Sequence, residues 1–104
     1  LDGFTPMGPC IVTADEIADV QNLDIRCYVN GQLRQSSNTK YMIQTVAGAI
    51  AELSQGMTLQ AGTIIATGTP AGVGMGMQPP TFLRSGDTVV CEIESIGRLE
   101  NTVK

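Results

Sequence analysis

The residues best suited to chemistry lie in a glycine-rich loop that follows the apolar run Thr63–Thr67. Its glycines allow backbone conformations that are closed to other residues. Thr67 and Thr69 offer hydroxyl groups beside free backbone amides. Such a loop can hold a small anion, although glycine-rich loops also serve as plain turns. The first glycine, Gly68, directly precedes Thr69.

The glycines of this loop do not form a nucleotide-binding motif. A phosphate loop opens onto a helix N-terminus, and a Walker loop carries a lysine after its glycines. Here Gln78-Pro79-Pro80 follows Gly76, and prolines do not continue into a regular helix. The functional alternative is a carboxylate held by loop amides and by the Thr69 hydroxyl. Each hydrogen bond to such a charged group contributes about 1.5 to 3 kcal/mol.

Other charged residues are weaker candidates. Glu92 and Glu94 share one strand face and could meet one divalent cation, but a solvated strand face explains them better. Arg34 could point at an acidic ligand. The alternative interpretation is that its side chain is an exposed, solvated charge. We therefore predict no catalytic residue and no metal ligand from the residue pattern alone.

Composition excludes several classes of function. The chain has 104 residues, which is the size of one domain, with 42% hydrophobic and 15% charged residues. Its net charge is -4, and its six basic residues are scattered. Two Tyr, two Phe and no Trp provide no set of stacking rings, so we expect no nucleic-acid partner. No apolar run approaches the roughly 18 residues that a membrane span needs, so we expect no membrane partner.

The chain contains no His and three widely spaced cysteines. Without His, a Ser-His-Asp triad, a Cys-His dyad or a His-ligated metal cannot be built from this chain alone. We interpret Cys10, Cys27 and Cys91 as reduced core residues of a cytoplasmic protein. The first residue is Leu1 and no signal-peptide pattern follows, so we expect a fragment, a processed product or a trimmed chain.

Periodicity predicts a mostly β, α+β chain with one main helix. Apolar residues alternate over 23–29, Asn30-Gly31 suits a type I′ turn, and 32–36 should return as a hairpin. Helical spacing predicts the main helix at about 39–54. Further strands are expected at Cys10–Val12, Thr63–Thr67, Val89–Glu94 and Arg98–Val103, with a loop over 68–80.

Several motifs, in their order and spacing, closely resemble the C-terminal half of the fumarylacetoacetate hydrolase family. The resemblance covers essentially all 104 residues, as a single partial domain over 1–104. It implies a truncated form of the family's roll of mixed β-sheets. The motifs are Asp2 to Pro9, Thr13 to Ile17, Val29-Asn30-Gly31, Arg34-Gln35, Ser37-Asn38-Thr39, Met42-Ile43, Gly68 to Gly74, Gly86-Asp87 and Glu92 to Gly97.

The resemblance also implies a site and a chemistry. Family members use magnesium to cleave C–C bonds, to decarboxylate or to isomerise acidic oxo-compounds such as acylpyruvates and other diketo acids. It places Thr69 and Gly68 against the substrate, with Pro6 and Gly8 as a wall and Arg34 as a further contact. The family's metal ligands lie upstream of the matched segment, so no magnesium is expected on this chain alone.

Two hypotheses follow. The first is a C-terminal segment of such a magnesium-dependent enzyme, inactive without its N-terminal half. The second is a stand-alone truncated module that catalyses nothing, self-associates, and binds small carboxylates or a protein partner. In both cases we expect a small carboxylate or oxo-acid ligand, a homodimer or a missing N-terminal half as partner, and a cytoplasmic location.

Overall fold

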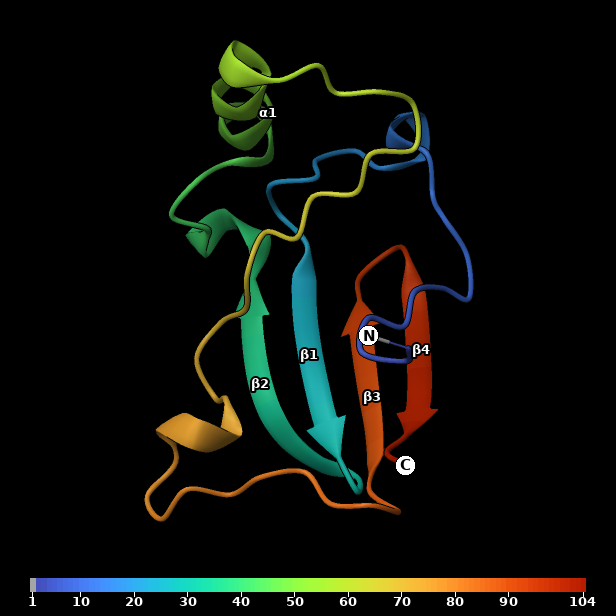
Figure 1. Cartoon of the computed structure of the whole chain (residues 1–104), viewed down its shortest axis with the longest axis vertical. Coiled ribbons are helices and arrows are strands. Elements are labelled where there is room, and N and C mark those ends of the chain that lie inside the picture. Colours follow the sequence, from blue (N-terminus) through green and yellow to red (C-terminus); the bar gives the residue numbers. More distant parts are fainter. Residues whose placement is uncertain (1) are drawn as a thin grey trace.

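One antiparallel sheet organises the computed structural model, which describes residues 2–104 (Figure 1). The strands lie in the order β2-β1-β3-β4, so the two central strands come from distant parts of the sequence. The mostly β class with one main helix is confirmed. The elements are β1 (Asp24–Val29), β2 (Gln32–Asn38), β3 (Thr88–Ile93), β4 (Gly97–Thr102), α1 (Val46–Gly56), and the single 3-10 turns η1 (Ala14–Glu16), η2 (Thr39–Tyr41) and η3 (Gly74–Gly76).

Two hairpins form the sheet, and both agree with the sequence prediction to within two residues. In the first, Asn30 (φ 50°) and Gly31 (φ 77°) take the left-handed conformations that a type I′ turn requires. In the second, Ser95 (φ 61°) and Gly97 (φ 128°) connect β3 to β4. The hairpins join through β1 and β3, which pair antiparallel over five residues each.

The main helix begins later than predicted. The 3-10 turn η2 ends at Tyr41, and Met42 (ψ 133°) leaves the helical region of the backbone. Thr45 then starts α1, because its side chain accepts a hydrogen bond at 3.0 Å from the Gly48 N–H. A capping residue thus overrides the apolar spacing that suggested one helix over 39–54. No helix in residues 2–104 has both the length and the apolar character that crossing a membrane requires.

Two predicted strands do not form. Cys10–Val12 and Thr63–Thr67 pair with no neighbour and lie outside the sheet. Their apolar side chains are largely exposed, at 92% for Ile11 and 66% for Ile64. β-branched residues favour a strand only where neighbours cover them, and these segments have no such neighbour. The predicted loop over 68–80 is irregular as expected, apart from η3.

The chain buries little of its apolar surface. Among the described residues only Ile17, Leu23 and Val90 form the buried hydrophobic core. The radius of gyration is 15.1 Å, compared with about 13 Å for a compact domain of this length. The prediction of core cysteines is wrong, because Cys10 and Cys91 are exposed and Cys27 is only half-buried. All three thiols are free.

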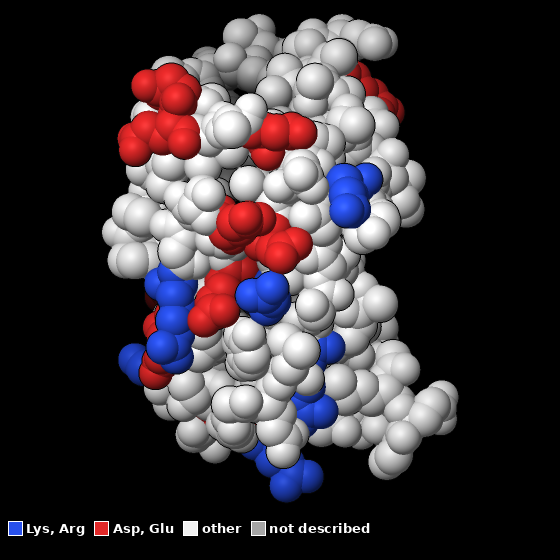
Figure 2. Space-filling view, turned by 180° about the vertical axis from the view of Figure 1, so that it is seen from behind, with Lys and Arg blue, Asp and Glu red and all other residues white. Residues whose placement is uncertain are grey.

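Charged side chains cover one face of the sheet. Alternation along the strands places Asp24, Arg26, Glu92, Arg98 and Glu100 on this face, opposite to Cys27 and Cys91. Figure 2 shows acidic and basic side chains mingled on the rear of the molecule. Arg98 pairs with Glu100 at 2.7 Å and with Glu92 at 3.9 Å. These ion pairs are exposed, so each contributes at most about 1 kcal/mol.

A hydrogen-bond network joins the first turn to the start of β3. Asp87 accepts hydrogen bonds from the Asn30 amide at 2.8 Å and from the Arg84 N–H at 2.7 Å. The Asn30 side-chain oxygen in turn accepts from the Thr88 N–H at 2.9 Å. These donors, the Asn30 amide first, hold the pKa of Asp87 below its ordinary value of 3.8. The network fixes the turn that precedes β3 against the first hairpin.

The network predicts a pH-dependent contribution to stability. Because the folded-state pKa of Asp87 is lowered, its contribution is complete above about pH 4 and is lost as the pH falls through the folded-state pKa. We expect Asp87→Asn to unfold at lower urea than the wild type at pH 7, and the difference to narrow below pH 4. Urea unfolding across pH 2–7, with Asp2→Asn as an exposed control, measures this. If the difference in urea midpoint between Asp87→Asn and the wild type is as large at pH 2 as at pH 7, the prediction is contradicted.

Candidate functional site

The site begins at an irregularity in β2. Cys27 of β1 pairs with Gln35, and the next pair along β1 is Tyr28 with Leu33. Arg34 therefore has no partner on β1 and forms a β-bulge. A bulge bends its strand and redirects the extra side chain. It allows Arg34 and Gln35, neighbours in sequence, to meet the glycine-rich loop together.

Gln35 fastens the loop to the sheet. Its side-chain amide donates to the Thr69 hydroxyl and to the Pro70 carbonyl, each at 2.8 Å. The Thr69 oxygen is thereby used as an acceptor, so its own hydrogen remains to donate elsewhere. Gly68 has φ +93° and open space on the side where a Cβ would project. Thr69 and Gly68 thus present a hydroxyl donor beside an unobstructed backbone.

Two glycines let the loop approach its neighbours closely. A Cβ on Gly72 would collide with the carbonyl of Arg34, and a Cβ on Gly74 would collide with the carbonyl of Thr81. The Thr81 N–H also donates to the Gly74 carbonyl at 2.9 Å. In the predicted anion-binding loop, Gly72 and Gly74 therefore allow close backbone packing, whereas Gly68 leaves open space beside the backbone.

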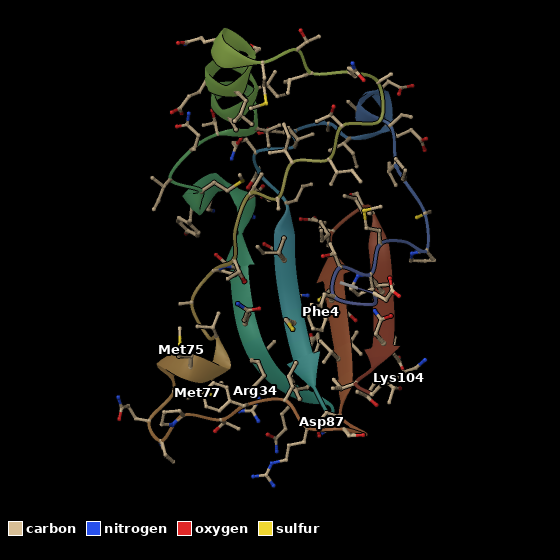
Figure 3. The ribbon with its side chains drawn as sticks, viewed as in Figure 1. Phe4, Arg34, Met75, Met77, Asp87 and Lys104 are labelled. Atoms are coloured by element: carbon tan, nitrogen blue, oxygen red, sulfur yellow. The ribbon has the colours of Figure 1, made fainter. Side chains whose placement is uncertain are left out.

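The loop and the sheet line a half-open cavity of about 940 Å³. Arg34 projects into this region toward Met77, and its Nη1 donates to the Met77 sulfur at 3.3 Å (Figure 3). Cys27 also lines the cavity. Partial burial, together with the neighbouring Cys91, raises the pKa of the Cys27 thiol to about 11. The cavity thus combines two guanidinium groups and one carboxylate with a neutral thiol and largely apolar walls.

The predicted site residues fall into two groups. Arg34 lies in β2 next to Gln35, and Gln35 connects the strand to Thr69 and hence to Gly68. Pro6 and Gly8 belong to the N-terminal segment, which crosses in front of β3 and β4 in Figure 1. Within residues 2–104 no hydrogen bond links that segment to the loop. The structure thus brings three of the five predicted residues together, and no hydrogen bond in the described chain connects them to the other two.

The role of Gln35 is not apparent from the sequence. In the Arg34-Gln35 pair, only the charge of Arg34 suggests a ligand contact. The signal was weak, because a bulge in β2 cannot be seen in the residue pattern. Without that bulge, the strand alternation alone would place the two side chains on opposite faces.

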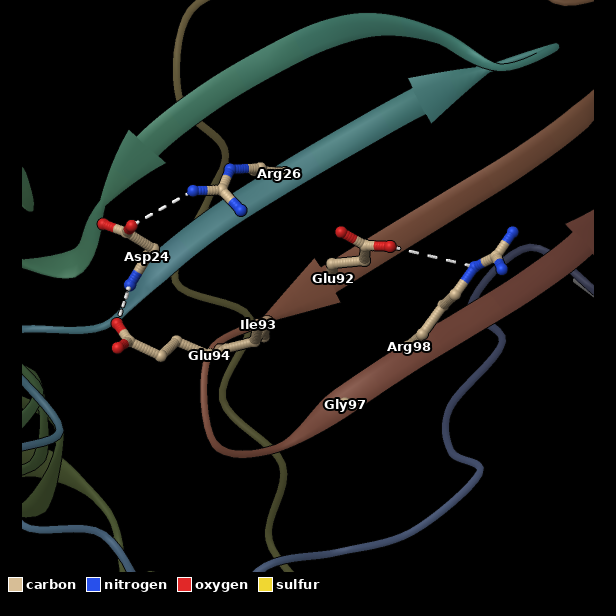
Figure 4. Close-up of a pocket in the computed structure, with 7 residues that line it drawn as sticks. All are labelled: Asp24, Arg26, Glu92, Ile93, Glu94, Gly97 and Arg98. Carbon is tan, nitrogen blue, oxygen red and sulfur yellow. Dashed lines mark hydrogen bonds and ion pairs between the residues drawn. The ribbon is translucent and has the colours of Figure 1, made fainter.

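The acidic residues are partnered within the protein. Asp24, Arg26, Glu92, Glu94 and Arg98 line an open hollow of about 480 Å³ (Figure 4). Glu94 accepts a hydrogen bond at 3.0 Å from the Asp24 N–H, and Glu92 faces Arg98. In the described part of the chain, no three Asp, Glu or Cys side chains gather as metal ligands would. These residues therefore do not fit a divalent metal.

Comparison with known proteins identifies the family. Residues 1–104 match the family described as fumarylacetoacetate (FAA) hydrolase C-terminal. The mitochondrial oxaloacetate tautomerase Fahd2a of Rattus norvegicus is 53% identical over 102 residues, which are 98% of this chain and 33% of that protein. The chain belongs to the fumarylacetoacetate hydrolase family.

Solved structures give the same assignment. Fumarylacetoacetate hydrolase from psychrophilic Exiguobacterium antarcticum superposes with a TM-score of 0.96 at 54% identity, covering 100% of this chain and 37% of that one. Maleylpyruvate hydrolase from Sphingobium sp. SYK-6, in complex with manganese(II) and pyruvate, superposes with a TM-score of 0.83 at 43% identity. The match covers 92% of this chain and 34% of that one. The chain spans about a third of the length of these relatives.

The close approach of Gly72 predicts that Gly72→Ala detaches the loop. The new methyl group would meet the Arg34 carbonyl, and the φ of +106° costs an L-residue about 1 to 2 kcal/mol. We expect lower stability in urea and shifted NMR signals for the Gln35 side-chain amide and for Thr69. The matched control is Gly76→Ala, whose Cβ would lie 3.6 Å from Val73 in ordinary contact. If Gly72→Ala and Gly76→Ala change the urea stability and the NMR signals equally, this account is contradicted.

Proposed function

We propose that this chain supplies the carboxylate-holding loop of an enzyme that acts on acidic oxo-compounds. The observation that carries the proposal is the pair of 2.8 Å hydrogen bonds from Gln35 to Thr69 and Pro70. The first of them occupies the Thr69 oxygen as an acceptor, which leaves the hydroxyl hydrogen free to be donated to a ligand. A relative is an oxaloacetate tautomerase, and a structural neighbour holds pyruvate, both of which are consistent with an oxo-acid substrate.

In this proposal each residue has a limited task. Thr69 donates its hydroxyl hydrogen to one carboxylate oxygen, and the backbone beside Gly68 receives the ligand without a steric barrier. Arg34 contributes positive charge from the bulge, although it is partly engaged by Met77. Pro6 and Gly8 would complete the wall only if the N-terminal segment moved toward β2. The chain would thus bind and orient a carboxylate rather than transform it.

The chemical step would come from outside the residues described here. A divalent metal, magnesium by our proposal, would supply Lewis-acid stabilisation of the enolate form of an oxo-acid when bound. Manganese is the metal in the structural neighbour named above. Since the acids of this chain do not fit a metal, we assign its ligands to a further segment. We accordingly propose no turnover by the 104-residue chain alone, whether the reaction is hydrolysis, decarboxylation or isomerisation.

The exposed apolar surface favours a second candidate function. Ile11, Ile43, Phe4 and Phe82 are between 66% and 105% exposed. A chain with so much uncovered apolar surface gains free energy by association. A non-catalytic module that self-associates and binds small carboxylates or a protein partner would account for this feature. In either case we propose that another polypeptide surface, a second copy or a further segment, covers these residues in a cytoplasmic protein.

The carboxylate proposal predicts the behaviour of Thr69→Val. This nearly isosteric change removes one hydroxyl donor to a charged ligand, worth about 1.5 to 3 kcal/mol, so oxalate or pyruvate affinity should fall about tenfold or more. Thr67→Val, the same change two positions away, should leave the affinity unaltered. NMR titration of the three proteins measures both affinities. If Thr69→Val and the wild type bind with equal affinity, the loop has only a structural role and the carboxylate proposal is wrong.

The association proposal predicts a dimer. Light scattering at rising micromolar concentration should give a mass approaching twice 10.9 kDa, because paired copies hide apolar faces and strand edges. The dimer should dissociate in low concentrations of urea before the sheet unfolds. A mass that stays at 10.9 kDa at every concentration would show that this chain needs no covering copy.

A further inference from the structure

We propose that Cys27 and Cys91 are an oxidisable thiol pair that closes a disulfide between the two central strands. The two residues are 64 positions apart in sequence, yet they are direct cross-strand partners of β1 and β3. They lie on the sheet face opposite the charged one. Nothing in the carboxylate-binding proposal requires them, so the pair stands on its own geometry.

The hydrogen-bond pattern places the pair at a favourable position. The Asn30 N–H donates to the Thr88 carbonyl, and the Glu94 N–H donates to the Asp24 carbonyl, each at 2.9 Å. These bonds make Asn30 with Thr88, and Asp24 with Glu94, hydrogen-bonded pairs. Hydrogen-bonded and non-hydrogen-bonded pairs alternate along β1 and β3. Cys27 and Cys91 lie three positions from each of these pairs and therefore form a non-hydrogen-bonded pair. The Cα atoms of such a pair are typically about 4.5 Å apart. Disulfides span Cα separations from about 4.4 to 6.8 Å, so the strands need not move apart.

The two thiols differ in a way that orders the reaction. Cys91 is exposed, whereas Cys27 is half-buried and its pKa is raised to about 11. The Cys91 thiolate therefore attacks a small-molecule disulfide first, forming a mixed disulfide and releasing one thiol. Cys27 then loses its proton to water and attacks the Cys91 sulfur, which releases the second thiol. Two protein thiols are oxidised and one external disulfide is reduced to two thiols.

Oxidation would act close to the candidate site. Cys27 pairs with Cys91 on one side and with Gln35 on the other, so the three residues form one row across the sheet. Gln35 is the residue that fastens Thr69. Cys27 also lines the cavity into which Arg34 projects. A disulfide would tie β1 to β3 beside the anchor of the loop.

The test is to oxidise the folded 104-residue chain with glutathione disulfide, alkylate it, and digest it with trypsin. Cleavage after Arg and Lys places Cys10, Cys27 and Cys91 in the separate peptides 1–26, 27–34 and 85–98. We expect mass spectrometry to find 27–34 joined to 85–98 within a single chain. The urea midpoint of the oxidised protein should rise and should return to its starting value with dithiothreitol.

Matched variants separate the pair from the third thiol. Cys10→Ser should leave the cross-link intact, whereas Cys91→Ser should abolish it. Cys10 donates to the Ile96 carbonyl at 3.7 Å, so it is a folded-state control with a known environment. A dominant cross-link that includes Cys10, or three cysteines that remain alkylated after oxidation, overturns the proposal.

Oxidation of the unfolded chain shows whether the fold selects the pair. Cys10 and Cys27 are 17 positions apart, compared with 64 for Cys27 and Cys91. Loop-closure entropy alone then favours the shorter loop by about sevenfold. In guanidinium chloride we expect Cys10 to Cys27 to predominate, the reverse of the folded preference. The same product under both conditions would show that the sheet does not direct the reaction.

Discussion

The candidate site depends on one side chain, Gln35, because the loop that follows Thr67 has no strand of its own to hold it. A loop without ladder hydrogen bonds must satisfy its polar groups through side chains. Gln35 does so at Thr69 and Pro70 with two hydrogen bonds of 2.8 Å. The absence of a side chain at Gly72 lets the backbone come close enough to β2 for these bonds to form. Position, orientation and openness of the site thus derive from the contact between a bulged strand and a glycine.

The sequence was sufficient to predict the two hairpins because their signals are local. The alternation over 23–29 and the Asn30-Gly31 turn determine the first hairpin without reference to the rest of the chain. The helix was predicted with the wrong start, because apolar spacing continues through Met42 while the Thr45 cap and the backbone at Met42 set the actual boundary. Local patterns identify elements better than they identify where elements end.

Features that depend on distant residues escaped prediction. Whether Thr63–Thr67 forms a strand is decided by whether another strand lies beside it, and none does in the described chain. The bulge at Arg34 is a shift of register between β1 and β2, and it depends on how the two strands pair. The meeting of Cys27 with Cys91 follows from the placement of β3 beside β1, which no spacing rule within either strand reveals. The Thr69 loop was singled out from its residue types and stays a proposed binding site, whereas its anchor Gln35 was not foreseen.

The separation that we propose, between a carboxylate-holding loop and metal ligands in a further segment, would have a physical basis. A loop built from amides and a hydroxyl carries no net charge, so it can fold in place before any ligand arrives. A metal site needs several carboxylates brought together, and their mutual repulsion is offset only when the cation is bound. In the described residues the acids avoid this cost, since Glu92 faces Arg98, Glu94 accepts from the Asp24 N–H, and Asp87 accepts from two neutral donors. This stretch of a longer family fold can therefore form its sheet and its loop without metal, and its exposed apolar side chains are consistent with the partner surface that we propose.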